Sequence, residues 1–112
     1  MKIESRMVDD VHILDCSGKL MMGTATIAVR NTIRTILKSG GRKIVLNLAE
    51  VNRIDTLGAN ELVSAYTTVV NQGGDMKLLC LTKKTRDILA ITRLVTAFQV
   101  YDCEKAMIAS FA

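Results

Sequence analysis

The hydrophobic residues of this chain follow two different periods, and the two alternate along the sequence. Short, nearly continuous apolar runs such as residues 44–48 are typical of strands covered on both faces of a sheet. Longer stretches such as residues 25–39 place apolar residues three or four positions apart, which is typical of an amphipathic helix. The pattern predicts strands at 2–8, 11–16, 44–48, 76–81 and 98–101, and helices at 25–39, 56–72, 83–92 and 103–111.

Turn and cap residues separate these elements. Residues 9–10 predict the turn of a hairpin, and residues 17–18 together with Gly23 predict a loop. The chain has no proline, so glycine pairs at 40–41 and 73–74 end the first two helices. The residues expected to cap the first, third and fourth helices are Thr24, Thr82 and Asp102. The residues expected on inner helix faces are Val29, Ile33, Ile36, Leu37, Leu62, Tyr66, Val69, Val70, Ile88, Leu89, Thr92, Met107, Ile108 and Phe111.

This order, β-β-α-β-α-β-α-β-α, predicts the α/β class, or α+β in some schemes. Strands that alternate with helices form a central sheet against which the helices pack, and the right-handed crossover rule places the helices largely on one side. A length of 112 residues without repeats or linkers predicts a single domain, residues 1–112.

The composition of the chain argues against a nucleic-acid-binding, membrane-spanning or secreted protein. The 15 Lys and Arg and 11 Asp and Glu residues are dispersed, and only 4% of residues are aromatic, so we expect no nucleic-acid binding. No apolar run reaches the ~18 residues of a membrane span, and the charged residues 2–6 exclude a typical secretory signal. We therefore expect a cytoplasmic protein.

Candidate catalytic and metal-binding residues are few. Cys16, Cys80 and Cys103 are far apart and form no C-x-x-C pair, so each is expected to be a small buried hydrophobe rather than part of a disulfide framework or zinc site. The single histidine, His12, is expected on a strand surface. No nucleotide-binding glycine motif and no nucleophile motif is present. We expect no enzyme activity, no metal and no cofactor.

The most informative stretch joins a strand to a helix at residues 51–62. Asp55 and Thr56 are both good N-cap residues, and the helix is expected to begin at Thr56 or Gly58. First-turn amides and the helix dipole favour an anion at this point, so a hydroxyl here is a chemically sensible phosphoacceptor as well as a cap.

Four segments of the chain resemble one family when they are taken in order. The string Ile54-Asp55-Thr56-Leu57-Gly58 follows the strand at 43–48, and residues 14–20 and 73–78 match the family's early turn and its next strand entry. This arrangement resembles the STAS domains, and among them the small single-domain bacterial anti-sigma factor antagonists. The resemblance covers nearly the whole chain and implies a mixed sheet of about four or five strands with four helices.

The resemblance also implies a function and a site. Thr56 would be phosphorylated by a partner that is both a serine/threonine kinase and an anti-sigma factor. The unphosphorylated form would bind this partner and release the sigma factor, phosphorylation would abolish binding, and a PP2C-type phosphatase would reset the switch. Asp55 would orient the hydroxyl or contact the kinase, and Gly58 would keep the approach to Thr56 uncrowded. The protein would be a monomer or weak dimer. The expected partner-binding residues are Met21, Met22, Asp55, Thr56, Leu57, Gly58 and Asn60.

A second interpretation makes the chain a non-catalytic STAS scaffold or accessory subunit of a signalling or transport complex. In that case Thr56 is only a helix cap. Leu57 replaces the second hydroxyl of the family pattern, and Ala59 and Asn60 replace its usual Leu and second Gly. These three residues favour the second interpretation.

Overall fold

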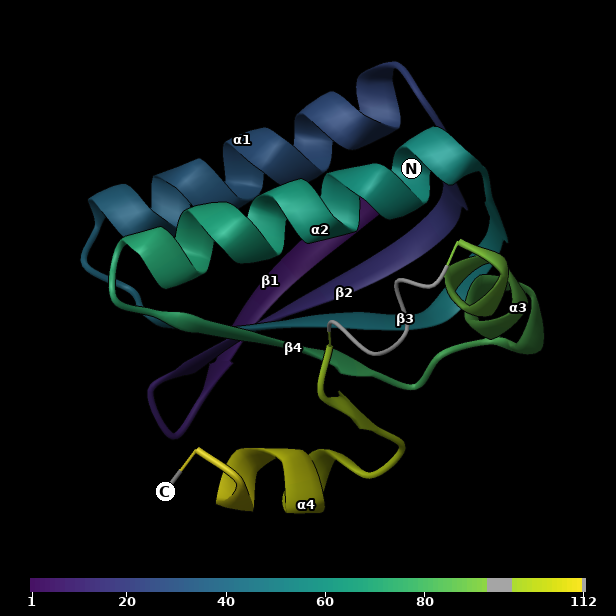
Figure 1. The fold of residues 1–112 in the computed structure, drawn as a ribbon. Coiled ribbons are helices and arrows are strands. Elements are labelled where there is room, and N and C mark those ends of the chain that lie inside the picture. Colours follow the sequence, from purple (N-terminus) through teal and green to yellow (C-terminus); the bar gives the residue numbers. More distant parts are fainter. Residues whose placement is uncertain (93–97, 112) are drawn as a thin grey trace.

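The structure, a computed structural model, describes residues 1–92 and 98–111 and shows a central sheet with helices on both faces (Figure 1). Within these residues, nine elements occur in the predicted order. They are β1 (Lys2–Val8), β2 (Val11–Leu20), α1 (Thr24–Lys38), β3 (Lys43–Ile54), α2 (Thr56–Asn71), β4 (Asp75–Leu79), α3 (Lys83–Ile91), β5 (Val100–Tyr101) and α4 (Glu104–Ala109).

The five strands form one mixed sheet in the order β1-β2-β3-β4-β5. β1 is antiparallel to β2, and the other neighbours are parallel, which confirms the predicted class. Residues 9–10 form the hairpin turn, with positive φ at both positions. Because β2 to β5 run in the same direction, their carboxyl ends lie along one edge of the sheet.

Two strands are longer than predicted. The expected loop at 17–18 is wrong, because β2 continues through it and pairs with β3 as far as Leu20 opposite Ile54. Register shifts occur between Asp15 and Ser17 and between Gly18 and Lys19, and Gly18 has a φ of 104° that glycine adopts without strain. The glycine therefore accommodates an irregularity within the strand and does not end it.

The larger of two apolar cores lies between the sheet and α1, α2 and α3. The inner helix positions Val29, Ile33, Leu62, Val69 and Leu89 are buried as predicted. Val70 was expected among them, but 43% of it is exposed, since it lies on the outer side of α2. Three helices therefore share one face of the sheet.

The smaller core lies on the opposite face, under α4 (Figure 1). Met107 is fully buried there against residues of β2, β3 and β4, with Ile108 and Phe111 beside it as predicted. Lys77, only 4% exposed, donates from Nζ to Ser110 Oγ at 2.8 Å and lies 4.2 Å from the Phe111 ring centre. The C-terminal end of the chain is thus attached to the sheet by both apolar and polar contacts.

An ion-pair cluster attaches the start of α4. Arg6 of β1 donates to Asp15 at 2.7 Å and also to Glu104, the first residue of α4. These hydrogen bonds to the guanidinium lower the pKa of both carboxyl groups. Both carboxylates therefore contribute stability above their ordinary pKa values, and this stability is lost as the pH falls through the lowered values.

Helix caps and cysteines correct several expectations. Thr82 caps α3 as predicted, accepting from the Thr85 amide at 3.2 Å. The N-cap positions of α1 and α4 are Gly23 and Cys103, one residue from the expected Thr24 and Asp102, respectively. The hydrophobic period shows which face of a helix is buried, but it does not show at which exposed residue the helix begins. It therefore cannot resolve these one-residue differences in the N-cap positions.

Of the three cysteines, which were all expected to be buried, only Cys16 is buried. Cys80 is half-buried and Cys103 is exposed.

Candidate functional site

The candidate site lies where β2 and β3 end side by side. Leu20 and Ile54 are paired, so the loop that follows each strand begins at the same edge of the sheet. One loop leads into α1 and the other directly into α2, and both helices begin at this end of the molecule (Figure 1). Residues 21–23 and 55–60, which are far apart in sequence, are therefore neighbours.

Asp55 holds these two loops together. Its Oδ1 accepts a hydrogen bond from the Gly58 amide at 2.6 Å, which is the N-cap bond of α2. Its Oδ2 accepts from the Met22 amide at 3.2 Å. Both carboxylate oxygens are thus occupied by backbone donors, so Asp55 is a positioning group and is poorly placed to act as a general base toward Thr56.

Thr56 is the first residue of α2, and its side chain is exposed. The helix therefore begins at Thr56 rather than at Gly58, and Asp55 alone supplies the cap. Because the cap does not require the Thr56 hydroxyl, this group is available at the surface beside the positive end of the helix dipole.

Gly58 faces inward, which corrects its expected role. The residue is buried, and a Cβ atom at this position would lie 2.1 Å from the Leu20 carbonyl oxygen. The absence of a side chain therefore lets the first turn of α2 approach the end of β2. Gly58 positions the backbone around Thr56 and does not open the approach to its hydroxyl.

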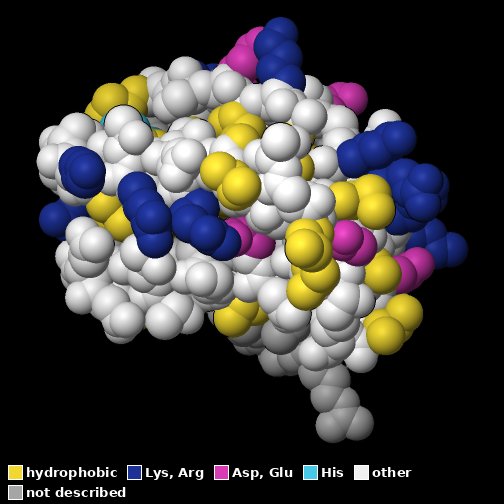
Figure 2. Space-filling view, turned by 90° about the horizontal axis from the view of Figure 1, so that it is seen from above, with side chains coloured by type: hydrophobic (Ala, Val, Ile, Leu, Met, Phe, Trp, Pro, Cys, Tyr) yellow, Lys and Arg dark blue, Asp and Glu magenta, His cyan; other side chains and the backbone are white. Residues whose placement is uncertain are grey.

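The remaining expected residues form a mixed surface around Thr56. Met22 is 71% exposed and Leu57 is 50% exposed, Asn60 is exposed, and Met21 is half-buried. Figure 2 views the face formed by α1 and α2 and shows hydrophobic side chains at the surface between groups of Lys and Arg. Exposed methionine and leucine beside a polar hydroxyl are typical of a protein-binding surface.

A groove next to this surface was not predicted. Arg53, Ile54, Lys84, Asp87 and Ile88 line an open groove of about 450 Å³ between the end of β3 and α3. The sequence did contain a signal for this groove. Basic residues, Lys84 among them, lie in the first turn of α3, where positive charge opposes the helix dipole and so has an unusual position. Only the fold places Lys84 of this turn beside Arg53, so the groove could not be predicted from the local pattern.

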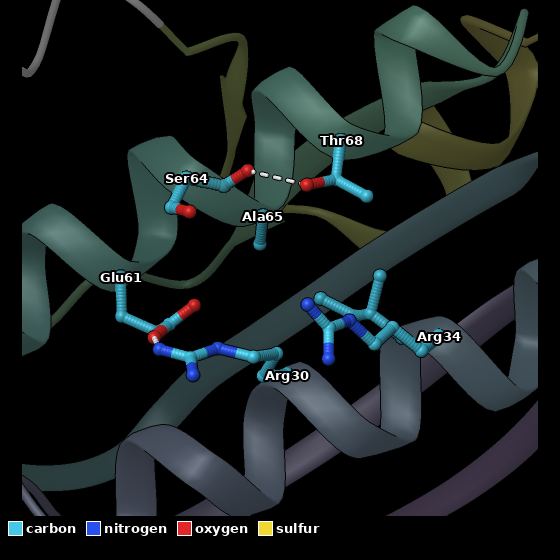
Figure 3. Close-up of a pocket in the computed structure, with 7 residues that line it drawn as sticks. Arg30, Arg34, Glu61, Ser64, Ala65 and Thr68 are labelled. Atoms are coloured by element: carbon cyan, nitrogen blue, oxygen red, sulfur yellow. Dashed lines mark hydrogen bonds and ion pairs between the residues drawn. The ribbon is translucent and has the colours of Figure 1, made fainter.

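A second hollow lies between α1 and α2 and contains an interhelical ion pair (Figure 3). Arg30 donates to Glu61 at 2.6 Å, and the Glu61 side chain is only 6% exposed. The hydrogen bond to Glu61 raises the pKa of Arg30. The hollow has a volume of about 30 Å³, enough for roughly one water molecule, so it serves packing between the helices rather than ligand binding.

The site offers protein-binding chemistry. Among residues 1–92 and 98–111 no group of three or more His, Cys, Asp or Glu side chains is placed to hold a metal ion. Within the same residues, no helix is long and apolar enough to cross a membrane. What the site presents is an exposed hydroxyl, an exposed apolar rim and a groove lined by basic, acidic and apolar side chains.

A family model described as the STAS domain matches residues 2–107. The chain belongs to the STAS family. The resemblance inferred from the Ile54-to-Gly58 string and its flanking segments is thereby confirmed. A Thermotoga maritima protein assigned as an anti-sigma factor antagonist is 28% identical to this STAS chain over 97 residues, which are 87% of this chain and 86% of that protein.

Solved STAS structures share the fold. A Thermotoga maritima protein with the same assignment has a TM-score of 0.87 at 25% identity, covering 96% of this chain and 92% of that one. The anti-sigma factor antagonist SpoIIAA in its unphosphorylated form has a TM-score of 0.82 at 18% identity, covering 98% and 96%. The phosphorylated form of Bacillus SpoIIAA has a TM-score of 0.76 at 18% identity, covering 99% and 100%.

Proposed function

We propose that this STAS domain is an anti-sigma factor antagonist controlled by phosphorylation of Thr56. The unphosphorylated form binds a cytoplasmic partner that is both anti-sigma factor and serine/threonine kinase, and so releases the sigma factor. The observation that carries the proposal is the exposed Thr56 side chain at the first position of α2, next to a cap that does not use it.

Electrostatics explains how a phosphate would act at this position. A phosphothreonine adds roughly −1.5 to −2 charge at neutral pH, directly beside the Asp55 carboxylate and the apolar side chains of Met22 and Leu57. A partner that covers these side chains would have to desolvate the phosphate, which opposes binding. First-turn amides tolerate the anion, so the fold itself is maintained.

The family context supports the same function. The relatives compared above are assigned as anti-sigma factor antagonists, and SpoIIAA has been solved in both unphosphorylated and phosphorylated forms. In the proposed cycle a PP2C-type phosphatase removes the phosphate from Thr56 and restores binding. The protein is acted upon and performs no catalysis itself.

The first experiment is intact-mass analysis of the protein isolated from its native cells, with fragment mapping of any phosphate. We expect phosphate on Thr56. The Thr56→Asp variant should then bind the kinase at least about 100-fold more weakly than wild type, a change of about 2.7 kcal/mol. Thr67→Asp is the matched control, because Thr67 is also exposed on α2 but lies three turns away, and it should bind normally. Wild-type affinity of Thr56→Asp would contradict the proposal.

One observation favours a second function, that of a non-catalytic scaffold subunit. Leu57 is half exposed where the family pattern has a second hydroxyl, so the site presents apolar surface that a permanent partner could cover. Stable co-purification with a large complex, together with a Thr56 that stays unmodified under growth and stress, would support this alternative over the switch.

A further inference from the structure

Two cysteines lie next to each other at the edge of the sheet where β4 and β5 end. Cys80 directly follows β4, and Cys103 lies between β5 and α4. The Cys80 amide donates to the Tyr101 carbonyl at 2.8 Å, and the Cys80 Sγ lies 3.5 Å from the carbonyl oxygen of Asp102. Asp102 immediately precedes Cys103, so the Cys80 sulfur points at the peptide unit that carries Cys103. Both thiols are free.

The backbone places Cys80 beside the segment that carries Cys103. Leu79 and Tyr101 are the last pair of the β4–β5 ladder, and Cys80 follows with a φ of 57°. The Asp102 carbonyl oxygen and the Cys103 Cα belong to one planar peptide unit, so the Cys80 Sγ, 3.5 Å from that oxygen, lies close to the backbone of Cys103. A disulfide joins Cα atoms that are about 4.4 to 6.8 Å apart, and this separation is what the bond requires of Cys80 and Cys103.

The two thiols differ in accessibility, which indicates the order of reaction. Cys103 is exposed and meets an oxidant first, whereas Cys80 is half-buried. Burial raises the pKa of the Cys80 thiol, and the charges of Asp102, Cys103 and Glu104 raise it further. Cys16 is buried within the main core, and burial raises its pKa to about 12. Cys16 therefore serves as an unreactive internal reference.

We propose that Cys80 and Cys103 form an intramolecular disulfide when the protein meets hydrogen peroxide. The Cys103 thiolate attacks one peroxide oxygen, the O–O bond breaks, and Cys103 becomes a sulfenic acid as water is released. The Cys80 sulfur then attacks the Cys103 sulfur, the S–O bond breaks, and a second water leaves. Two thiols are oxidised and one peroxide is reduced to two waters. The modification is independent of the phosphorylation of Thr56.

The bond would fix the start of α4. This helix begins at Glu104, one residue after Cys103, and is attached to the sheet by Met107 and by the ion pair of Arg6 with Glu104. A covalent link from Cys103 to the end of β4 adds a further attachment, at the first turn of the helix. Because α4 covers the smaller core, oxidation is expected to slow the opening of that face of the sheet.

The test uses the purified full chain with and without a small excess of hydrogen peroxide. We expect a mass loss of about 2 Da, the two hydrogens removed on disulfide formation, and a rise in Tm of roughly 5 to 10 °C that dithiothreitol reverses. Trypsin places Cys16, Cys80 and Cys103 in three separate peptides, 7–19, 78–83 and 94–105. The last two should be found linked, while Cys16 remains a thiol.

Two serine variants separate the steps. In Cys80→Ser the sulfenic acid at Cys103 should persist and react with dimedone, and in Cys103→Ser the mass should not change under the same treatment. Oxidation of wild-type Cys103 to sulfinic acid with Cys80 still a thiol would overturn the proposal. A disulfide between the Cys103 residues of two chains, seen as a dimer on a non-reducing gel, would overturn it equally.

Discussion

Replacement of Gly58 by alanine tests the packing that places Thr56. The added Cβ would lie 2.1 Å from the Leu20 carbonyl oxygen, a backbone atom that cannot rotate away. The first turn of α2 must therefore move outward, and overpacking of this kind costs about 3 kcal/mol. Alanine is favoured over glycine in a helix by about 1 kcal/mol. The expected net result is a loss of about 2 kcal/mol in the free energy of unfolding, obtained by subtracting the second value from the first.

Urea denaturation followed by circular dichroism measures this change. With a slope of about 2 kcal/mol per molar urea, Gly58→Ala should lower the unfolding midpoint by about 1 M. The matched control is Asn60→Ala, an alanine substitution at an exposed position of the same helix, which should change stability by less than about 0.5 kcal/mol.

The higher helix propensity of alanine and the contact with Leu20 change the stability of Gly58→Ala in opposite directions, so the sign of the measured change distinguishes them. If the contact with Leu20 were unimportant, alanine would stabilise α2 and Gly58→Ala would unfold at a higher urea concentration than wild type. A midpoint equal to or above the wild-type value would therefore refute the packing argument and the role assigned to Gly58.

Three further predictions concern charged groups. Asp55→Ala should destabilise the domain by about 1 to 2 kcal/mol in urea denaturation, because the cap of α2 and the bond to the neighbouring loop are both lost. Arg30→Ala should lower the urea midpoint because it leaves the buried Glu61 carboxylate unpaired, whereas Arg34→Ala, on the same helix, should not. Arg6→Ala should destabilise the domain most at neutral pH, and its difference from wild type should shrink as its two carboxylate partners become protonated below about pH 4.

Each of these predictions has an outcome that contradicts it. An Asp55→Ala variant with wild-type stability would show that water replaces the carboxylate at the helix start. Equal midpoints for Arg30→Ala and Arg34→Ala would remove the special role of the interhelical ion pair. A stability difference for Arg6→Ala that stays constant from pH 7 to about pH 3 would mean that its carboxylates are not stabilised by the guanidinium.

The element order and the strand-to-helix junction that forms the candidate site could be predicted from the sequence. Helical spacing identified the buried residues Val29, Ile33 and Leu62 because burial of one helix face requires apolar residues at that period. The string around Asp55 and Thr56 marked a strand-to-helix junction with a capping carboxylate, and Asp55 does cap α2. These features depend on residues close together in sequence, so local pattern is sufficient to find them.

Contacts between distant segments could not be predicted in the same way. The bond from the Met22 amide to Asp55, the fit of Gly58 against Leu20 and the groove between Arg53 and Lys84 each join residues more than thirty positions apart. Periodicity shows which face of an element is buried, but it does not show which neighbour covers that face.

The sequence alone therefore determined the alternation of strands and helices and the family, and it supplied Thr56 as the proposed phosphoacceptor. Only the tertiary structure decided that Gly58 packs closely against Leu20, that α4 lies on the opposite face of the sheet from the other helices, and that Cys80 lies beside the peptide unit that carries Cys103. The physical reason is that local propensity and hydrophobic period act over a few residues, whereas strand pairing and helix packing bring together side chains from separate parts of the chain.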